Sequence, residues 1–230
     1  MTRLAIRLDS YRGEASEDRA LVLHAASGAL VLAVADGVGE QHGGGEAAQL
    51  AIETVEMEGA GLVRRDARVW RGLLNALDDA LMAHPEAGQT TLVALCLTAQ
   101  KIIGASVGSA EAWWITHDGH FDLTEAQKRK PALGTGSAEP VPFELKLSAP
   151  GTLLLASDGL FKYADPLAIT EAVRTTKTAE EAADALHTLA CAPGGRFYDD
   201  LALIVVRVET KSIRDTIAPW TRFSHHYKAG

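Results

Sequence analysis

The chain is poor in cysteine and in aromatic residues, and it has no long uninterrupted hydrophobic segment. Its two cysteines, Cys96 and Cys191, show no repeated spacing, which favours reduced residues over a disulfide and predicts a cytoplasmic location. No apolar run approaches the ~20 residues that a membrane-spanning helix requires. The first residues, Met1 to Arg7, are too polar for a signal peptide. We therefore expect no membrane association.

Basic residues are also few, 22 Lys and Arg against 30 Asp and Glu, which gives a formal net charge of -8. Binding to nucleic acid or to an anionic membrane depends on basic patches, so neither partner is expected. With 47% hydrophobic and 23% charged residues, the composition is that of an ordinary globular protein. A length of 230 residues is best interpreted as one large domain.

Hydrophobic periodicity predicts strands and helices in an order that is informative about fold. Strand-like segments lie near residues 3–8, 19–25, 29–35, 91–98, 101–107, 112–116, 145–148, 152–157 and 201–208. Helical spacing covers residues 46–57, 67–84, 166–175 and 179–189. The helices come in pairs between groups of strands, which favours two packed sheets with helices outside. The sequence predicts a folded domain over residues 1–208 and a polar C-terminal extension over residues 209–230.

Three aspartates lie where apolar segments meet loops. Asp36 follows residues 30–35, Asp158 follows residues 153–157, and Asp199 precedes residues 201–206. A carboxylate at the end of a buried strand is costly to desolvate unless something compensates its charge. If these strand ends converge, a divalent cation that prefers oxygen ligands relieves the repulsion. The pattern therefore predicts a metal site at one edge of the sheets.

Each motif has another explanation when it is taken alone. The glycines between residues 37 and 43 follow a strand and precede a helix, as in a plain turn or a dinucleotide-binding loop. Asp36 opposes dinucleotide binding, because its carboxylate would face the pyrophosphate. The acidic pair Glu17-Asp18 would ordinarily be solvated surface. Together, in this order and each beside a strand, the motifs favour one site over separate turns.

The ordered set resembles the metal-dependent protein phosphatases of the PP2C type, in their short bacterial form. The matching segments are Glu17-Asp18, Ala35 to Gly39 with His42 to Glu46, Gln89 to Val93, Ile103 to Gly108, Ser157 to Leu160, and Asp199 to Val206. The resemblance implies an α+β fold, a four-layer α-β-β-α sandwich of two mainly antiparallel sheets flanked by helices. Residues 123–147 are too few for the large flap subdomain usual in the family.

The resemblance also implies the roles of individual residues. Asp36, Asp158 and Asp199 are expected to be catalytic and to ligate two Mn²⁺ or Mg²⁺ ions, together with the carbonyl of Gly37. Glu17 and Asp18 match an acidic pair that supports the metals, and Arg12 is expected to bind phosphate. Arg12 lies one position farther from Glu17 than the arginine of the family does.

Three positions depart from the family pattern. Ser109 replaces an aspartate associated with a third metal, which predicts a two-metal core with a weak or empty third site. Val38 replaces a histidine that is a candidate general acid in some members. Asp200 stands where the family usually has asparagine, so it is expected to be a neighbour of the ligands.

The implied function is hydrolysis of phosphoserine or phosphothreonine in proteins by a metal-activated bridging water. The expected partners are a phosphorylated protein substrate and a cognate serine/threonine kinase in signal transduction, and we expect a monomer. The alternative is a regulatory or scaffolding protein of the same fold with little or no activity. Three retained acids oppose that alternative, since a binding module does not need them unpaired. A haloacid-dehalogenase-like phosphatase is disfavoured because residue 34 is Val, which breaks the Asp-x-Asp motif.

Overall fold

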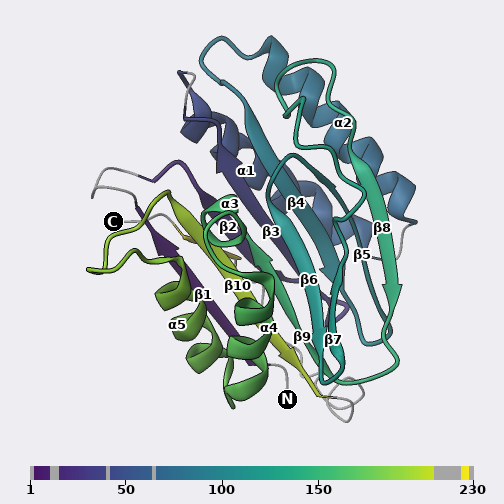
Figure 1. Cartoon of the computed structure of the whole chain (residues 1–230). Coiled ribbons are helices and arrows are strands. Elements are labelled where there is room, and N and C mark those ends of the chain that lie inside the picture. Colours follow the sequence, from purple (N-terminus) through teal and green to yellow (C-terminus); the bar gives the residue numbers. More distant parts are fainter. Residues whose placement is uncertain (1–2, 11–15, 40–41, 64–65, 210–223, 228–230) are drawn as a thin grey trace.

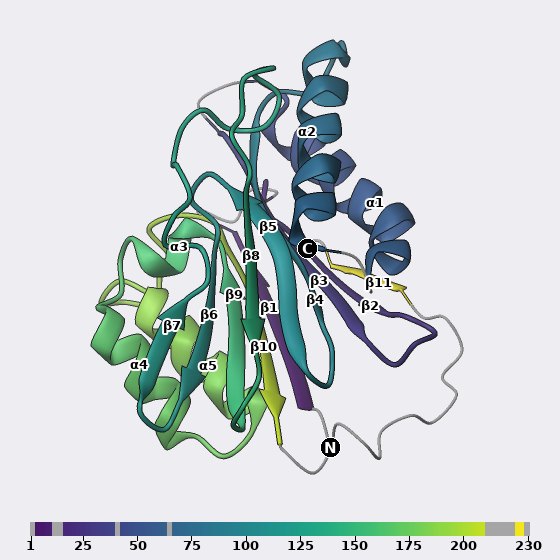
Figure 2. The ribbon, with the colours of Figure 1, turned by 90° about the vertical axis from the view of Figure 1, so that its right-hand side faces the viewer.

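Two antiparallel sheets pack face to face, and helices cover both outer faces (Figures 1 and 2). The computed structural model describes residues 3–10, 16–39, 42–63, 66–209 and 224–227. The five-stranded sheet has the order β1-β10-β9-β6-β7, and the six-stranded sheet has the order β11-β2-β3-β4-β5-β8. The predicted four-layer sandwich of the α+β class is confirmed.

Helices α3, α4 and α5 cover the five-stranded sheet. The elements of this half are β1 (Arg3–Asp9), β6 (Glu111–Thr116), β7 (Gly119–Asp122), β9 (Gly151–Ala156), α3 (Asp158–Phe161), α4 (Pro166–Thr175), α5 (Ala179–Ala190) and β10 (Leu201–Val208). Helices α1 and α2 cover the other sheet. The elements of that half are β2 (Arg19–His24), β3 (Leu30–Gly37), α1 (Gly44–Leu62), α2 (Ala67–Ala83), β4 (Thr90–Leu97), β5 (Lys101–Val107), β8 (Val141–Lys146) and β11 (Ser224–Tyr227).

Burial on both faces explains why the central strands are continuously apolar. In β3, Leu32 and Val34 belong to the core between the two sheets. Their neighbours Val31 and Ala33 belong to the core beneath α1 and α2. A strand with two dry faces needs an apolar residue at every position, so its sequence shows no alternation.

The structure differs from the predicted elements where burial is incomplete. Strand β8 begins at Val141 instead of 145, because it is a half-exposed edge strand whose alternating burial and Pro142 weaken the apolar signal. Helix α1 continues to Leu62. Strand β11 was not predicted; it pairs antiparallel with β2, with Ser224 opposite Leu23. Because β11 lies beyond residue 208, the extension contributes a strand to the edge of the sheet.

A buried aspartate organises the segment between β7 and β8. Asp78 of α2 accepts hydrogen bonds at Oδ1 from the backbone N–H groups of Gly134 (2.7 Å), Thr135 (3.0 Å) and Gly136 (3.1 Å). Its Oδ2 accepts one from the N–H of Ala138 (2.9 Å). A carboxylate that accepts several N–H groups holds a loop more firmly than neutral acceptors do. The segment between β7 and β8 is therefore held against α2, whereas the family usually has a flap subdomain in this part of the chain.

Asp78→Ala is expected to lower the free energy of unfolding by roughly 3 kcal/mol, since it removes a buried carboxylate that accepts from four partly buried backbone donors. Urea unfolding followed by circular dichroism measures the change. The exposed neighbour Asp79→Ala is the matched control and should change the value by less than about 0.5 kcal/mol. Equal effects of the two substitutions would contradict this role for Asp78.

Candidate active site

The acidic residues singled out by sequence lie at the same edge of the two sheets. Asp36 pairs with Thr91 at the end of β3, Asp158 begins α3 directly after β9, and Asp199 lies just before β10. The hydroxyl of Thr90 donates to the carbonyl oxygen of Asp36 (2.9 Å) and so fixes the end of β3. The electrostatic influence of these acids on one another, described below, places them in one cluster.

Both Asp-Gly pairs owe their glycine to a close approach of backbones. A Cβ on Gly37 would lie 2.6 Å from the carbonyl carbon and oxygen of Gly44, at the start of α1. A Cβ on Gly159 would collide with the carbonyl oxygen of Asp200. Neither glycine has a positive φ, so the requirement is for space. Gly37 therefore lets the end of β3 pack against the start of α1, and Gly159 lets the start of α3 pack against the backbone of Asp200.

Residues 16–18 are held in place from both halves of the sandwich. The N–H of Glu17 donates to Oδ2 of Asp200 (2.7 Å), which ties this segment to the start of β10. Arg19 donates through Nη1 to the carbonyl oxygens of Ser16 (2.6 Å) and Asp18 (2.8 Å). The backbone N–H of Asp18 donates to Oγ of Ser16 (3.1 Å), and repulsion from Asp158, Asp199 and Asp200 contributes to the raised pKa of Asp18. The acidic pair is therefore part of the cluster, and its second member is buried.

The pKa values of the cluster record how poorly its charges are compensated. Burial raises the pKa of Asp18 to about 8, and repulsion by Asp200, Asp158 and Asp199 adds to the effect. Burial, then repulsion by Asp18 and the other acids, raises the pKa of Asp36 well above its usual range. Burial followed by repulsion from Asp199 raises the pKa of Asp158. Such shifts are typical of groups arranged for function.

The donor set fits a hard divalent cation. Oδ2 of Asp18 is buried and has no hydrogen-bond partner, although an ionised oxygen needs one. Oε2 of Glu17 lies against Gly39 and Gly44, where a Cβ would be 2.9 and 3.1 Å away. Among the described residues no three His, Cys, Asp or Glu side chains already surround one point. Mg²⁺ usually keeps several waters and takes one or two carboxylates, so a site for this ion does not require three protein side chains around one point.

Two cations and a hydroxyl border the acids, and the sequence did not indicate their contacts. Nζ of Lys162 lies 3.3 Å from Oδ2 of Asp199. The positive charges of Lys162 and Arg129, and a hydrogen bond with Ser109, partly lower the pKa of Asp158. One feature of the sequence could have placed Lys162 near Asp158, because residues four apart lie on the same side of a helical turn. The backbone N–H of Lys162 indeed donates to the carbonyl oxygen of Asp158. Arg12, expected to bind phosphate, lies outside the described residues.

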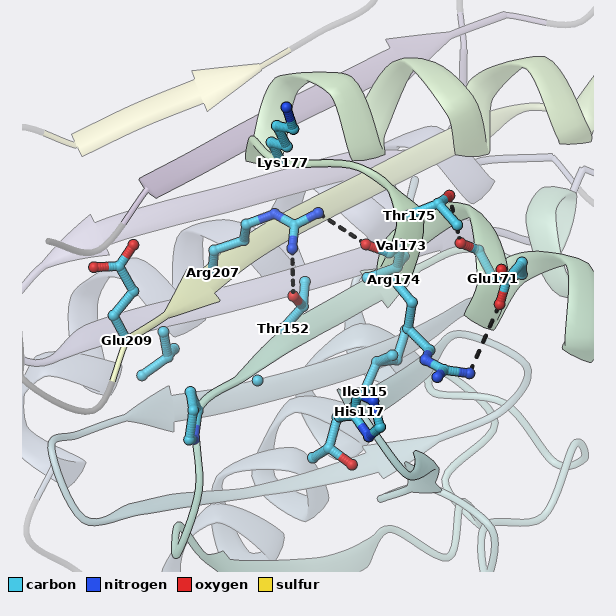
Figure 3. Close-up of a pocket in the computed structure, with 14 residues that line it drawn as sticks. Ile115, His117, Thr152, Glu171, Val173, Arg174, Thr175, Lys177, Arg207 and Glu209 are labelled. Atoms are coloured by element: carbon cyan, nitrogen blue, oxygen red, sulfur yellow. Dashed lines mark hydrogen bonds and ion pairs between the residues drawn. The ribbon is translucent and has the colours of Figure 1, made fainter.

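A cavity of about 430 Å³ lies at the other end of the same strands (Figure 3). It is lined by the first residues of β9 and the last residues of β10, whereas Asp158 follows β9 and Asp199 precedes β10. Arg207 in this cavity donates through Nη2 to the carbonyl oxygens of Val173 and Thr176, both at 2.8 Å. It therefore satisfies the C-terminal carbonyls of α4, and the cavity is separate from the acidic cluster.

The sandwich and its acidic edge define the class as a PP2C-type phosphatase fold. The chain belongs to the Stage II sporulation protein E (SpoIIE) family, whose profile matches residues 26–209. No curated protein matches the sequence at a significant level.

Solved structures with the same fold include serine/threonine phosphatase Stp1 from Staphylococcus aureus, with a TM-score of 0.80 and 19% identity over 91% of this chain and 96% of that one. The catalytic domain of the serine/threonine protein phosphatase PstP, in complex with two manganese ions, has a TM-score of 0.71 and 23% identity over 90% and 98%. RsbX in complex with magnesium has a TM-score of 0.71 and 17% identity over 90% and 94%. At these identities the likeness establishes the fold.

Proposed function

We propose that this protein is a protein serine/threonine phosphatase that uses two Mn²⁺ or Mg²⁺ ions. The ions would be held by the carboxylates of Asp36, Asp158 and Asp199, the Gly37 carbonyl, and the Glu17-Asp18 pair. The observation that carries the proposal is the pair of acids Asp18, which is buried, and Asp36, which is half-buried and close enough to repel it. Among the residues the structure describes, no Lys, Arg or His forms an ion pair with either. Buried carboxylates without a cationic partner are strongly unfavourable unless another cation binds them.

The protein residues have separable tasks in this site. Bound divalent ions supply an activated water as nucleophile and neutralise charge on the phosphoryl oxygens. Thr90 fixes the backbone carbonyl of Asp36 at the end of β3, and Arg19 and Asp200 hold the segment that carries Glu17 and Asp18, so both segments are positioned before any ligand arrives. Positioned groups lose little entropy on reaching the transition state. Lys162 and Arg129 supply positive charge beside Asp158.

The wider setting is proposed from the relatives and the composition. Stp1 and PstP are named as serine/threonine phosphatases, which supports a phosphorylated protein as substrate and a cognate kinase as its source. Cys96 and Cys191 are both free, which supports a cytoplasmic location. None of the described helices has the length and apolar character needed to cross a bilayer. We propose a monomer with one catalytic domain over residues 1–208.

A regulatory or scaffolding role is the second candidate, and one specific observation favours it. Lys162 lies 3.3 Å from Oδ2 of Asp199 and offsets part of its charge, and Ser109 places a neutral hydroxyl beside Asp158. A regulatory or scaffolding protein would keep the phosphatase fold but hydrolyse phosphoesters slowly or not at all.

Hydrolysis of p-nitrophenyl phosphate and of a phosphothreonine peptide by the purified protein tests the proposal. We expect turnover that requires Mn²⁺ or Mg²⁺ and stops with excess chelator. Binding of Mn²⁺ without turnover of either substrate would favour the regulatory role. Full activity in excess chelator would exclude the two-metal site.

A further inference from the structure

Lys162 is held beside one metal-site acid by an aromatic pair. Its ammonium lies 3.3 Å from Oδ2 of Asp199 and 5.2 Å from the centroid of the Tyr163 ring. Tyr163 stacks on Tyr198, with ring centroids 4.8 Å apart and planes 20° apart. Tyr198 directly precedes Asp199, and Tyr163 directly follows Lys162. The stack therefore joins the two segments that carry the ammonium and the carboxylate.

We propose that Lys162 is a built-in competitor for the divalent cation at Asp199. The inference rests on the proposed function, in which Asp199 is a metal ligand. An ammonium and a metal ion that approach the same carboxylate oxygen repel each other, so the ammonium must move away before Asp199 can coordinate closely. The side chains of Lys162 and Asp199 are 48% and 42% exposed, which gives the ammonium a route to solvent.

The competition divides the acidic cluster into two parts. Asp18 and Asp36 form no ion pair with a described Lys, Arg or His, so they are available to the first cation. Asp199 already has a positive neighbour, so the cation that needs Asp199 binds more weakly. An exposed ion pair is worth little, so Lys162 sets the affinity of this second cation without abolishing its binding. Lys162 thereby determines the metal concentration at which the site becomes complete.

Isothermal titration calorimetry with Mn²⁺ measures this directly and needs no substrate. Lys162→Met should tighten the weaker dissociation constant by about threefold to tenfold. Lys162→Arg keeps the charge and should not tighten it. Lys101→Met is the matched control: Lys101 pairs with Glu144 at the same 3.3 Å, at the start of β5, away from the cluster. An unchanged or weaker Mn²⁺ affinity in Lys162→Met would overturn the proposal.

A double-mutant cycle separates direct competition from long-range repulsion. In an Asp199→Asn background Lys162 has lost its carboxylate partner, so Lys162→Met should alter Mn²⁺ affinity much less than it does in the wild type. If Lys162→Met tightened Mn²⁺ binding equally in both backgrounds, Lys162 would act only by long-range electrostatic repulsion, and the proposal would be wrong.

If Asp199→Asn binds too little Mn²⁺ to measure, lysine ammonium NMR of the wild type during a Mg²⁺ titration distinguishes direct competition from long-range repulsion. We expect the Lys162 signal, assigned by its loss in Lys162→Met, to move toward that of a free lysine as Mg²⁺ binds. A signal that stays unchanged at saturation would overturn the proposal. Metal-dependent hydrolysis with no effect of Lys162→Met would leave the proposed function standing and remove only this inference.

Discussion

Asp36→Asn is expected to reduce kcat/KM for p-nitrophenyl phosphate by at least about 100-fold at saturating Mn²⁺, which is about 2.7 kcal/mol of lost transition-state stabilisation. Asp36 is one of the carboxylates that would hold the ions, and an amide oxygen is a weaker ligand for a hard cation. Asp158→Asn should have a comparable effect. Both variants should stay folded, because an amide relieves repulsion within a cluster whose acids already raise one another's pKa.

The control for this loss is an acid outside the cluster. Asp79→Ala removes an exposed carboxylate of α2 and should leave kcat/KM unchanged within a factor of about two. Near-ultraviolet circular dichroism and a cooperative urea transition establish that the inactive variants are folded. An Asp36→Asn protein that is folded and retains most of its metal-dependent activity would exclude the proposed role.

The stability of the metal-free protein should fall as the pH rises from about 4 to about 8. The pKa of Asp18 is raised from 3.8 to about 8, so the folded state holds this proton more tightly than the unfolded chain does. A raised pKa contributes stability that is fully present below the unfolded value and is lost as pH rises through the folded value. Melting temperature in chelator, measured at intervals between pH 5 and pH 8, should therefore decrease.

Mn²⁺ should reverse this trend, and its effect should be larger at pH 8 than at pH 5. Metal ions and protons compete for the same carboxylates, so metal binds more tightly once the protons have left. A cation at a hundredfold excess over its dissociation constant adds about 2.7 kcal/mol to the stability of the folded state. Asp18→Asn should raise the melting temperature of the metal-free protein at pH 8 and blunt the response to Mn²⁺. A melting curve that is insensitive to Mn²⁺ at every pH would count against the site.

The sequence by itself determined most of the strands, the four longer helices and the positions of the acids along the chain. Strands such as β3 and β4 are buried on both faces, so nearly every residue carries the apolar signal, and their ends were predicted to within two residues. The Asp-Gly pairs were visible for the same reason, because each interrupts an apolar run where its strand ends. The predicted sandwich and the family resemblance followed from the order of these local features. The chemical roles of Glu17, Asp18, Asp36, Asp158 and Asp199 remain predictions.

Only the tertiary structure decided which distant groups meet. Asp78 lies at least 56 residues from the N–H groups that it accepts, and Lys162 lies 37 residues from Asp199. Nothing near either residue in the sequence marks its partner, since an aspartate in a helix or a lysine after one is ordinarily solvated. Strand β11 joins its sheet through backbone pairing with β2 and has no apolar pattern to announce it. Local periodicity encodes which residues are buried, whereas contacts between polar groups depend on how the buried elements are brought together.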